Sequence, residues 1–144
     1  NNITWQKTNP PPNLACRCFT HSTETILWAK KNDKKSRHFF DYQKMKEMNG
    51  GKQMKDVWTG ALTKPSEKTE GKHPTQKPEY LLEKIVLSST EEGQVILDPF
   101  CGSGTAGVEA VRFGRKFIGI DVSEEYLDIS KKRMEKVAND KKRF

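Results

Sequence analysis

A short apolar run that ends in an acidic residue and a glycine-rich turn limits the fold of this chain more than any other feature. The run Val95-Ile96-Leu97 leads into Asp98-Pro99, which is typical of a buried parallel strand that a proline stops. The turn Gly102-Ser103-Gly104 follows, and residues 105–113 then show helical spacing of apolar side chains. Strand, glycine turn and helix in this order predict a parallel α/β unit.

The same order repeats along the rest of the chain. Residues 116–120 read as a second strand that ends at Asp121, and Ser123 is placed to cap a long helix after it. Upstream, residues 75–89 are predicted to form a helix that feeds the Val95 strand, with Pro78 in its first turn. We therefore expect a mostly parallel sheet with flanking helices.

The first half of the chain has weaker signals. Strands are predicted at residues 3–5 and 25–29, joined by a proline-rich connection. The lysine-rich stretch 30–72 holds few apolar residues and is expected to be a loop or small insert that could contact DNA, with Trp58 either anchoring it to the core or stacking on a base. A length of 144 residues suits one domain, which we divide at 1–29, 30–72 and 73–144.

Charge and cysteine content narrow the class of protein. Lys and Arg number 26 against 19 Asp and Glu, and this surplus of +7 favours polyanions, so nucleic acid is the first partner to test. Three cysteines make no disulfide framework, which favours a reducing compartment. Apolar runs are too short for a membrane span, so a cytoplasmic protein is expected. No metal site is predicted, because Cys16, Cys18 and His21 have no second ligand pair.

The glycine turn could hold either of two adenosine cofactors, or it could be a turn without a ligand. Residues 102–107 read G-x-G-x-x-G, and Asp121 lies 19 residues beyond Gly102, as a ribose-binding acid would. Asp98 separates the two cofactors, because its carboxylate would repel a pyrophosphate but attract the ammonium group of a methionine moiety. Two unit charges about 4 Å apart interact by about 4 kcal/mol at an effective dielectric of about 20. S-adenosylmethionine is therefore favoured over a dinucleotide.

These motifs resemble those of bacterial DNA amino-methyltransferases of the type II restriction-modification kind, in the class where the cofactor motif follows the catalytic motif. The resemblance rests on DPFCGSGT (98–105), FIGIDV (117–122), HPTQKP (73–78), ITWQKTNPPP (3–12) and ETILW (24–28). It implies a Rossmann-like methyltransferase fold that depends on S-adenosylmethionine and is incomplete in this chain. The cofactor-binding residues that we expect are His73, Pro74, Thr75, Gln76, Asp98, Phe100, Cys101, Gly102, Ser103, Gly104, Thr105, Asp121 and Val122.

The resemblance does not locate the catalytic residues in this chain. The family uses Asp, Ser or Asn, then two prolines and an aromatic residue, to hold the amine and stack on the base. The chain offers only Asn9-Pro10-Pro11-Pro12, whose fourth residue is no aromatic platform. Asn9 is thus a weak catalytic candidate, and a proline turn is the favoured interpretation. The catalytic motif is expected upstream of Asn1 or on a partner chain.

The resemblance implies methyl transfer to the exocyclic amine of a flipped base in double-stranded DNA, with adenine favoured over cytosine. This chain alone is expected to be inactive, and Lys7, Arg17 and Lys77 are candidate nucleic-acid contacts. Four alternatives stay open: a non-catalytic or split-enzyme DNA-binding subunit, a homodimer, a dinucleotide-dependent oxidoreductase, and a methyltransferase acting on RNA or protein. The expected compartment is the bacterial cytoplasm.

Overall fold

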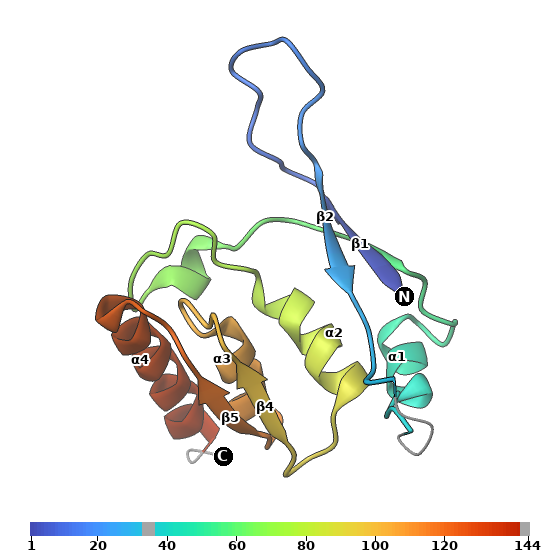
Figure 1. Cartoon of the computed structure of the whole chain (residues 1–144), viewed down its shortest axis with the longest axis vertical. Helices are drawn as coiled ribbons and strands as arrows, with labels where there is room; N and C mark the ends of the chain where they lie inside the picture. The colour runs from blue at the N-terminus through green and yellow to red at the C-terminus, as the bar shows by residue number, and fades with distance from the viewer. Residues whose placement is uncertain (33–36, 142–144) are drawn as a thin grey trace.

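The computed structural model describes residues 1–32 and 37–141. Two separate sheets form the frame (Figure 1). The first sheet, in the order β2-β1-β3, contains β1 (Asn2–Lys7), β2 (Thr23–Leu27) and β3 (Val57–Gly60). The second sheet pairs β4 (Val95–Asp98) with β5 (Lys116–Gly119) in parallel. The expected mostly parallel sheet is thus present as two pieces.

In the part of the chain that the structure describes, four α-helices and one short 3-10 helix accompany the sheets. They are α1 (Tyr42–Met48), the 3-10 helix η1 (Pro65–Lys68), α2 (Glu79–Ser89), α3 (Thr105–Arg112) and α4 (Glu124–Lys141). In Figure 1, α3 and α4 lie together with β4 and β5, while α2 runs between the two sheets. Among the described residues, no helix is both long enough and apolar enough to cross a membrane.

The core of the first sheet is built around two tryptophans. β1 pairs in parallel with β3, which sets Trp5 beside Trp58, and antiparallel with β2. Trp5 is 1% exposed, and together with Trp58 it packs on Leu81 of α2. Because side chains alternate along a strand, one face of the sheet turns to α2 and the other to solvent. The strand predicted at residues 3–5 is confirmed, and the one predicted at 25–29 lies two residues earlier.

The stretch 30–72, which was expected to be a loop or small insert, contains secondary structure that the sequence analysis did not predict. It contains α1, capped by an Asp41 oxygen that accepts the N–H of Lys44 at 2.9 Å, and it contains β3. Trp58 is buried and donates its ring N–H to the carbonyl of Lys55, so it anchors this stretch to the core. The sequence signal is weak because β3 is four residues long and forms only through pairing with β1. Residues 33–36 of this stretch lie outside the described residues.

The predicted parallel unit is confirmed. β4 and β5 pair so that Leu97 lies opposite Ile118. Gly114 follows the end of α3 with φ of +74°, a conformation that suits glycine after a helix. α4 begins after Ser123, whose hydroxyl oxygen accepts the N–H of Tyr126 at 3.3 Å, as expected of its N-cap.

The helix predicted over residues 75–89 starts later, at Glu79. Pro78 is the N-cap with an extended backbone (ψ of 146°), and it is not a residue of the first turn. The proline ring disfavours the helical conformation in the residue before it, which keeps residues 73–77 out of the helix. This segment is therefore available to pack beside the glycine turn.

Candidate cofactor-binding site

The site begins where β4 and β5 end side by side. The acid after β5 fastens the turn after β4, because the backbone N–H of Gly102 donates to Asp121 Oδ2 at 2.8 Å. A second link joins the N–H of Cys101 to the carbonyl of Ile120 at 2.9 Å. The glycine turn and the acid that the sequence separates by 19 residues are thus one structural unit.

Asp121 is held as a carboxylate. Its two oxygens accept the backbone N–H groups of Ser123 (3.0 Å) and Gly102. These hydrogen bonds favour the charged form and lower the pKa of Asp121 below its ordinary value. A carboxylate oxygen has more than one lone pair, so both oxygens can accept a further hydrogen bond from a ligand hydroxyl.

The segment 73–77 lies against the glycine turn. A side-chain carbon added at Gly102, where φ is +50°, would lie 2.9 Å from His73 Nε2, so only glycine fits this close approach. The His73 ring packs on Tyr126 of α4 with centroids 4.3 Å apart. The Thr105 hydroxyl donates to the carbonyl of Lys77 at 3.1 Å. The two motifs therefore form the two walls of one site.

A cavity of about 250 Å³ lies between these walls. Most of the predicted cofactor-binding residues line it: His73, Thr75, Gln76, Asp98, Phe100, Cys101, Gly102, Ser103 and Thr105. Gly104 is the N-cap of α3, and Asp121 holds the turn from outside the lining. Pro74 and Val122 are exposed and are not lining residues, and Phe100 is 88% exposed at the mouth.

The polar lining joins the Asp98 carboxylate to groups that can both donate and accept, and it also includes Lys77. Gln76 is 8% exposed, and its amide nitrogen donates to the carbonyl of Glu67 at 2.8 Å. Its Oε1 has no partner among the described residues. Asp98 accepts the N–H of Phe100 at 3.1 Å through Oδ1 alone. Burial and the charges of Asp98 and Asp121 raise the pKa of the Cys101 thiol, so it stays protonated. A cationic or hydroxyl-bearing ligand suits this set of groups.

Comparison with known proteins assigns the chain to a family. Residues 1–132 match the DNA methylase family N6_N4_Mtase. The chain belongs to this family. The resemblance drawn from DPFCGSGT, FIGIDV and HPTQKP is thereby confirmed.

The curated relatives of this chain are about twice its length. It is 74% identical over 138 residues to the type II methyltransferase M2.LlaDCHI of Lactococcus lactis subsp. cremoris, covering 96% of this chain and 51% of the relative. It is 73% identical over 135 residues to M2.DpnII of Streptococcus pneumoniae, covering 94% and 50%. The chain thus spans about half the length of the curated relatives it matches.

Solved structures confirm the fold. M1.HpyAVI, solved as a complex with SAM, superposes with a TM-score of 0.75 at 38% identity, over 93% of this chain and 61% of that one. The cytosine-N4-specific PvuII DNA methyltransferase gives a TM-score of 0.76 over 99% and 55%. Its identity of 21% supports the fold alone.

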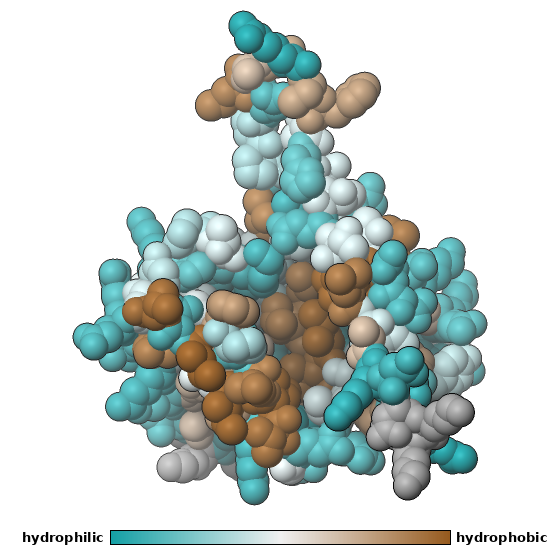
Figure 2. Space-filling view, in the orientation of Figure 1, coloured by the Kyte–Doolittle hydropathy of each residue, from teal (hydrophilic) through white to brown (hydrophobic). Residues whose placement is uncertain are grey.

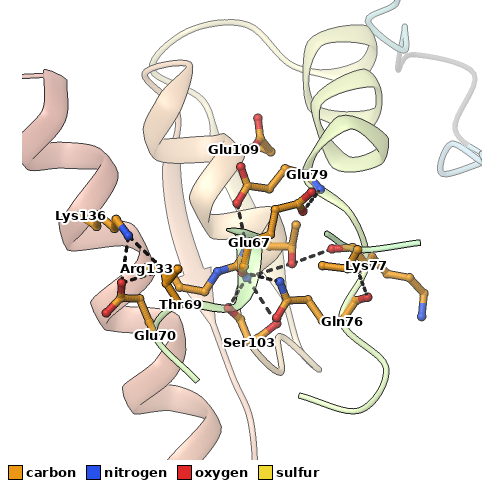
Figure 3. A network of polar contacts seen from close by, with 12 residues as sticks. Glu67, Thr69, Glu70, Gln76, Lys77, Glu79, Ser103, Glu109, Arg133 and Lys136 are labelled. Atoms are coloured by element: carbon orange, nitrogen blue, oxygen red, sulfur yellow. Dashed lines mark hydrogen bonds and ion pairs between the residues drawn. The ribbon is translucent and has the colours of Figure 1, made fainter. Parts of the chain in front are cut away.

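One residue behind the glycine turn was missed by the sequence analysis. Arg133 of α4 is 5% exposed (Figure 3). Its Nη1 donates to the carbonyl of Ser103 at 2.8 Å and to the hydroxyl of Thr105 at 3.1 Å. A usable signal exists, since Arg133 stands four residues from both Ile129 and Val137 on the apolar side of the helix.

Arg133 belongs to a chain of ion pairs that joins three helices. Its Nη2 lies 3.0 Å from Glu79 Oε1, and Arg112 bridges Glu79 at 2.7 Å to Glu109 at 2.6 Å. Glu109 is fully buried, and one of its oxygens has no partner among the described residues. Burial raises the pKa of Glu109 to about 7, although Arg112 opposes the shift. These ion pairs hold α2, α3 and α4 together next to the glycine turn.

The three residues predicted to contact nucleic acid differ in exposure and in their ion pairs. Lys7 lies 2.9 Å from Glu24 with its side chain 9% exposed, so a phosphate contact is not proposed for it. Lys77 lies 3.5 Å from the same carboxylate and is 42% exposed. Burial opposes ionisation of Glu24, but Lys7 and Lys77 outweigh it and lower its pKa. Arg17 is exposed on the loop that projects between β1 and β2 (Figure 1).

Asn9 has a structural partner. Its Oδ1 accepts the N–H of Leu62 at 2.8 Å, and the neighbouring Thr8 N–H donates to the carbonyl of Gly60 at 3.0 Å. Asn9 therefore ties the base of the projecting loop to the chain after β3. This contact supports the proline-turn interpretation of Asn9-Pro10-Pro11-Pro12.

Proposed function

We propose that this chain is the cofactor-binding part of an S-adenosylmethionine-dependent DNA methyltransferase. The observation that carries the proposal is the single cavity that brings together Asp98, the glycine turn and segment 73–77, with Asp121 at its edge. Acidic residues after two neighbouring parallel strands, beside a glycine turn, suit an adenosine ligand with a cationic tail.

The residues fit the cofactor group by group. Asp98 would accept a hydrogen bond from the α-ammonium group. Asp121 keeps lone pairs for the ribose hydroxyls, and the exposed Phe100 and Val122 offer apolar contacts to the adenine. The bound cofactor supplies an electrophilic methyl group on its sulfonium. The residues of this chain bind and orient it.

The methyl acceptor in this proposal is the exocyclic amine of a base flipped out of double-stranded DNA, adenine rather than cytosine. The motif that holds the amine and stacks on the base is supplied by polypeptide outside residues 1–144. This chain alone then transfers no methyl group to unmethylated DNA, and turnover by it alone would contradict the proposal. The enzyme would act in the bacterial cytoplasm as part of a restriction-modification system.

Calorimetry with S-adenosylmethionine tests the cofactor assignment. Asp121→Ala is expected to weaken binding about tenfold or more, because it removes the ribose acceptor and the brace on Gly102. Asp128→Ala is the matched control, since Asp128 is exposed on α4 and holds no part of the turn. Binding of NAD in place of S-adenosylmethionine would overturn the assignment.

A further inference from the structure

The projecting loop between β1 and β2, residues 8–22, carries large apolar side chains that lie in solvent. Phe19 is 100% exposed, and Leu14 is 89% exposed. Figure 1 shows this loop standing clear of both sheets, and Figure 2 shows brown side chains at its outer end. Apolar surface in water is unfavourable, and an apolar patch that stays exposed marks an interaction site. The outer end of the projecting loop is therefore a surface that suits a partner.

The outer end of the projecting loop is held in shape by hydrogen bonds of Asn13. Its carbonyl accepts the N–H of Cys16 at 3.1 Å, and its side-chain amide donates to the carbonyl of Cys18 at 2.9 Å. These two bonds close a turn that comes directly before Phe19 in the chain. The three prolines at positions 10–12 restrict the backbone that leads into the turn. A preformed loop loses little conformational freedom on binding, which favours affinity.

The base of the projecting loop is fastened to a wall of the cofactor cavity. Glu24 of β2 lies 2.9 Å from the ammonium group of Lys7 at the end of β1, so one carboxylate joins the two strands that carry the loop. The same carboxylate lies 3.5 Å from the ammonium group of Lys77, which lines the cavity. A nucleic-acid strand that offers an amine to this cavity would therefore pass beside the loop.

The charge of the projecting loop suits DNA. Residues 8–22 contain no Asp or Glu, and Arg17 lies between the two large apolar residues in the sequence. The chain as a whole carries a surplus of +7, which attracts polyanions. Proteins that distort DNA insert Phe and Leu side chains between bases as wedges, and arginines fix such proteins on the phosphates. An exposed ring beside an exposed arginine therefore favours a nucleic-acid partner.

A flipped base leaves a gap in the base stack, and opening this gap costs stacking free energy. An aromatic side chain that stacks on the neighbouring bases offsets part of this cost. We propose that the projecting loop inserts Phe19 into the base stack of duplex DNA, in the gap left by the flipped base, with Arg17 on a nearby phosphate. This inference rests on the proposed function for the nature of the substrate.

The test compares two duplexes of one sequence, one intact and one with a single abasic site that mimics the gap. Fluorescence anisotropy measures the affinity of the full chain for each. The wild type is expected to bind the abasic duplex at least tenfold more tightly. Phe19→Ala should lose this preference, whereas Phe19→Trp should keep it because an aromatic ring is retained. Val95→Ala, 56% exposed at the start of β4, is the matched control and should behave as the wild type.

An unchanged preference in Phe19→Ala, with folding verified by circular dichroism, would overturn the inference, as would absence of DNA binding by the wild type. A homodimer that Phe19→Ala disrupts, detected by light scattering, would assign the exposed ring to a second copy of the chain instead. Calorimetry measures S-adenosylmethionine binding separately, and Phe19→Ala should leave it unchanged because Phe19 is not a lining residue of the cavity. A preference that depends on Phe19 without cofactor binding would count against the cofactor assignment alone.

Discussion

At the scale of single residues, Arg133 shows how a buried charge can serve a binding loop. Burying a guanidinium is unfavourable unless it is paired and hydrogen-bonded. Arg133 meets both conditions, with Glu79 as its counterion and Ser103 and Thr105 as acceptors. The same contacts fix the shape of the glycine turn, so we expect Arg133 to act as a positioning residue for the proposed cofactor.

Arg133→Met is expected to weaken S-adenosylmethionine binding about tenfold, because the turn loses its brace. Calorimetry measures the affinity, and urea unfolding shows separately how far the protein is destabilised. Lys131→Met, exposed on the same helix, is the control. Arg133→Lys keeps the charge without the two-sided fork and should recover part of the affinity. An unchanged affinity in folded Arg133→Met would contradict the positioning role.

Glu109 predicts a pH dependence of stability. Burial raises its pKa to about 7 in the folded protein, from the ordinary value of 4.5. The folded state therefore binds the proton more tightly, and the stability that Glu109 contributes is fully present below about pH 4.5 and lost as the pH rises to about 7. Glu109→Gln, which cannot ionise, should flatten the free energy of unfolding over this window. A slope identical to wild type in urea titrations would argue against this origin.

At the scale of elements, α2 links the first sheet to segment 73–77. Its Tyr80 hydroxyl accepts the ring N–H of Trp5 at 2.8 Å and donates to the carbonyl of Ala61 at 3.0 Å. The ring also lies against Gly60, where an added side-chain carbon would clash with it. β1, β3 and α2 are thereby held in one register.

Tyr80→Phe should destabilise the fold by about 1–3 kcal/mol, because it leaves the Trp5 N–H and the Ala61 carbonyl without their partner. The free energy of unfolding in urea measures the effect. Tyr42→Phe, at an exposed position of α1, is the matched control and should change stability little. Equal stabilities of the two variants would show that the Tyr80 hydroxyl contributes nothing.

At the scale of the whole molecule, the charge of +7 predicts salt-sensitive DNA binding. Each phosphate contact contributes about −0.9 to the slope of log affinity against log salt for duplex DNA. Arg17→Ala should remove about one phosphate contact and make this slope shallower by about 0.9. Lys7→Ala should leave the slope unchanged, because Lys7 forms an ion pair with Glu24. Fluorescence anisotropy over a salt series checks this, and a flat response of the wild type would exclude phosphate contacts.

The sequence by itself determined the parallel unit and the glycine turn, whereas the lining residues of segment 73–76 were predicted only through the resemblance to a known family. Proline after Asp98, glycines at 102 and 104 and the Ser123 cap act on residues near them in the chain, so local pattern was sufficient to predict them. The helix that became α2 was predicted to start at residue 75, four residues before its observed start at Glu79. A local rule would have corrected this, because the residue before a proline disfavours the helical conformation.

Only the tertiary structure decided the contacts between distant residues. β3 has only four residues, and it forms through pairing with β1, which lies about 50 residues earlier in the chain. Arg133 reaches Ser103 across 30 residues, and Lys7 is withdrawn from solvent by Glu24 on the next strand. Such pairings depend on which surfaces the folded chain brings together, and no local spacing of residue types encodes that proximity.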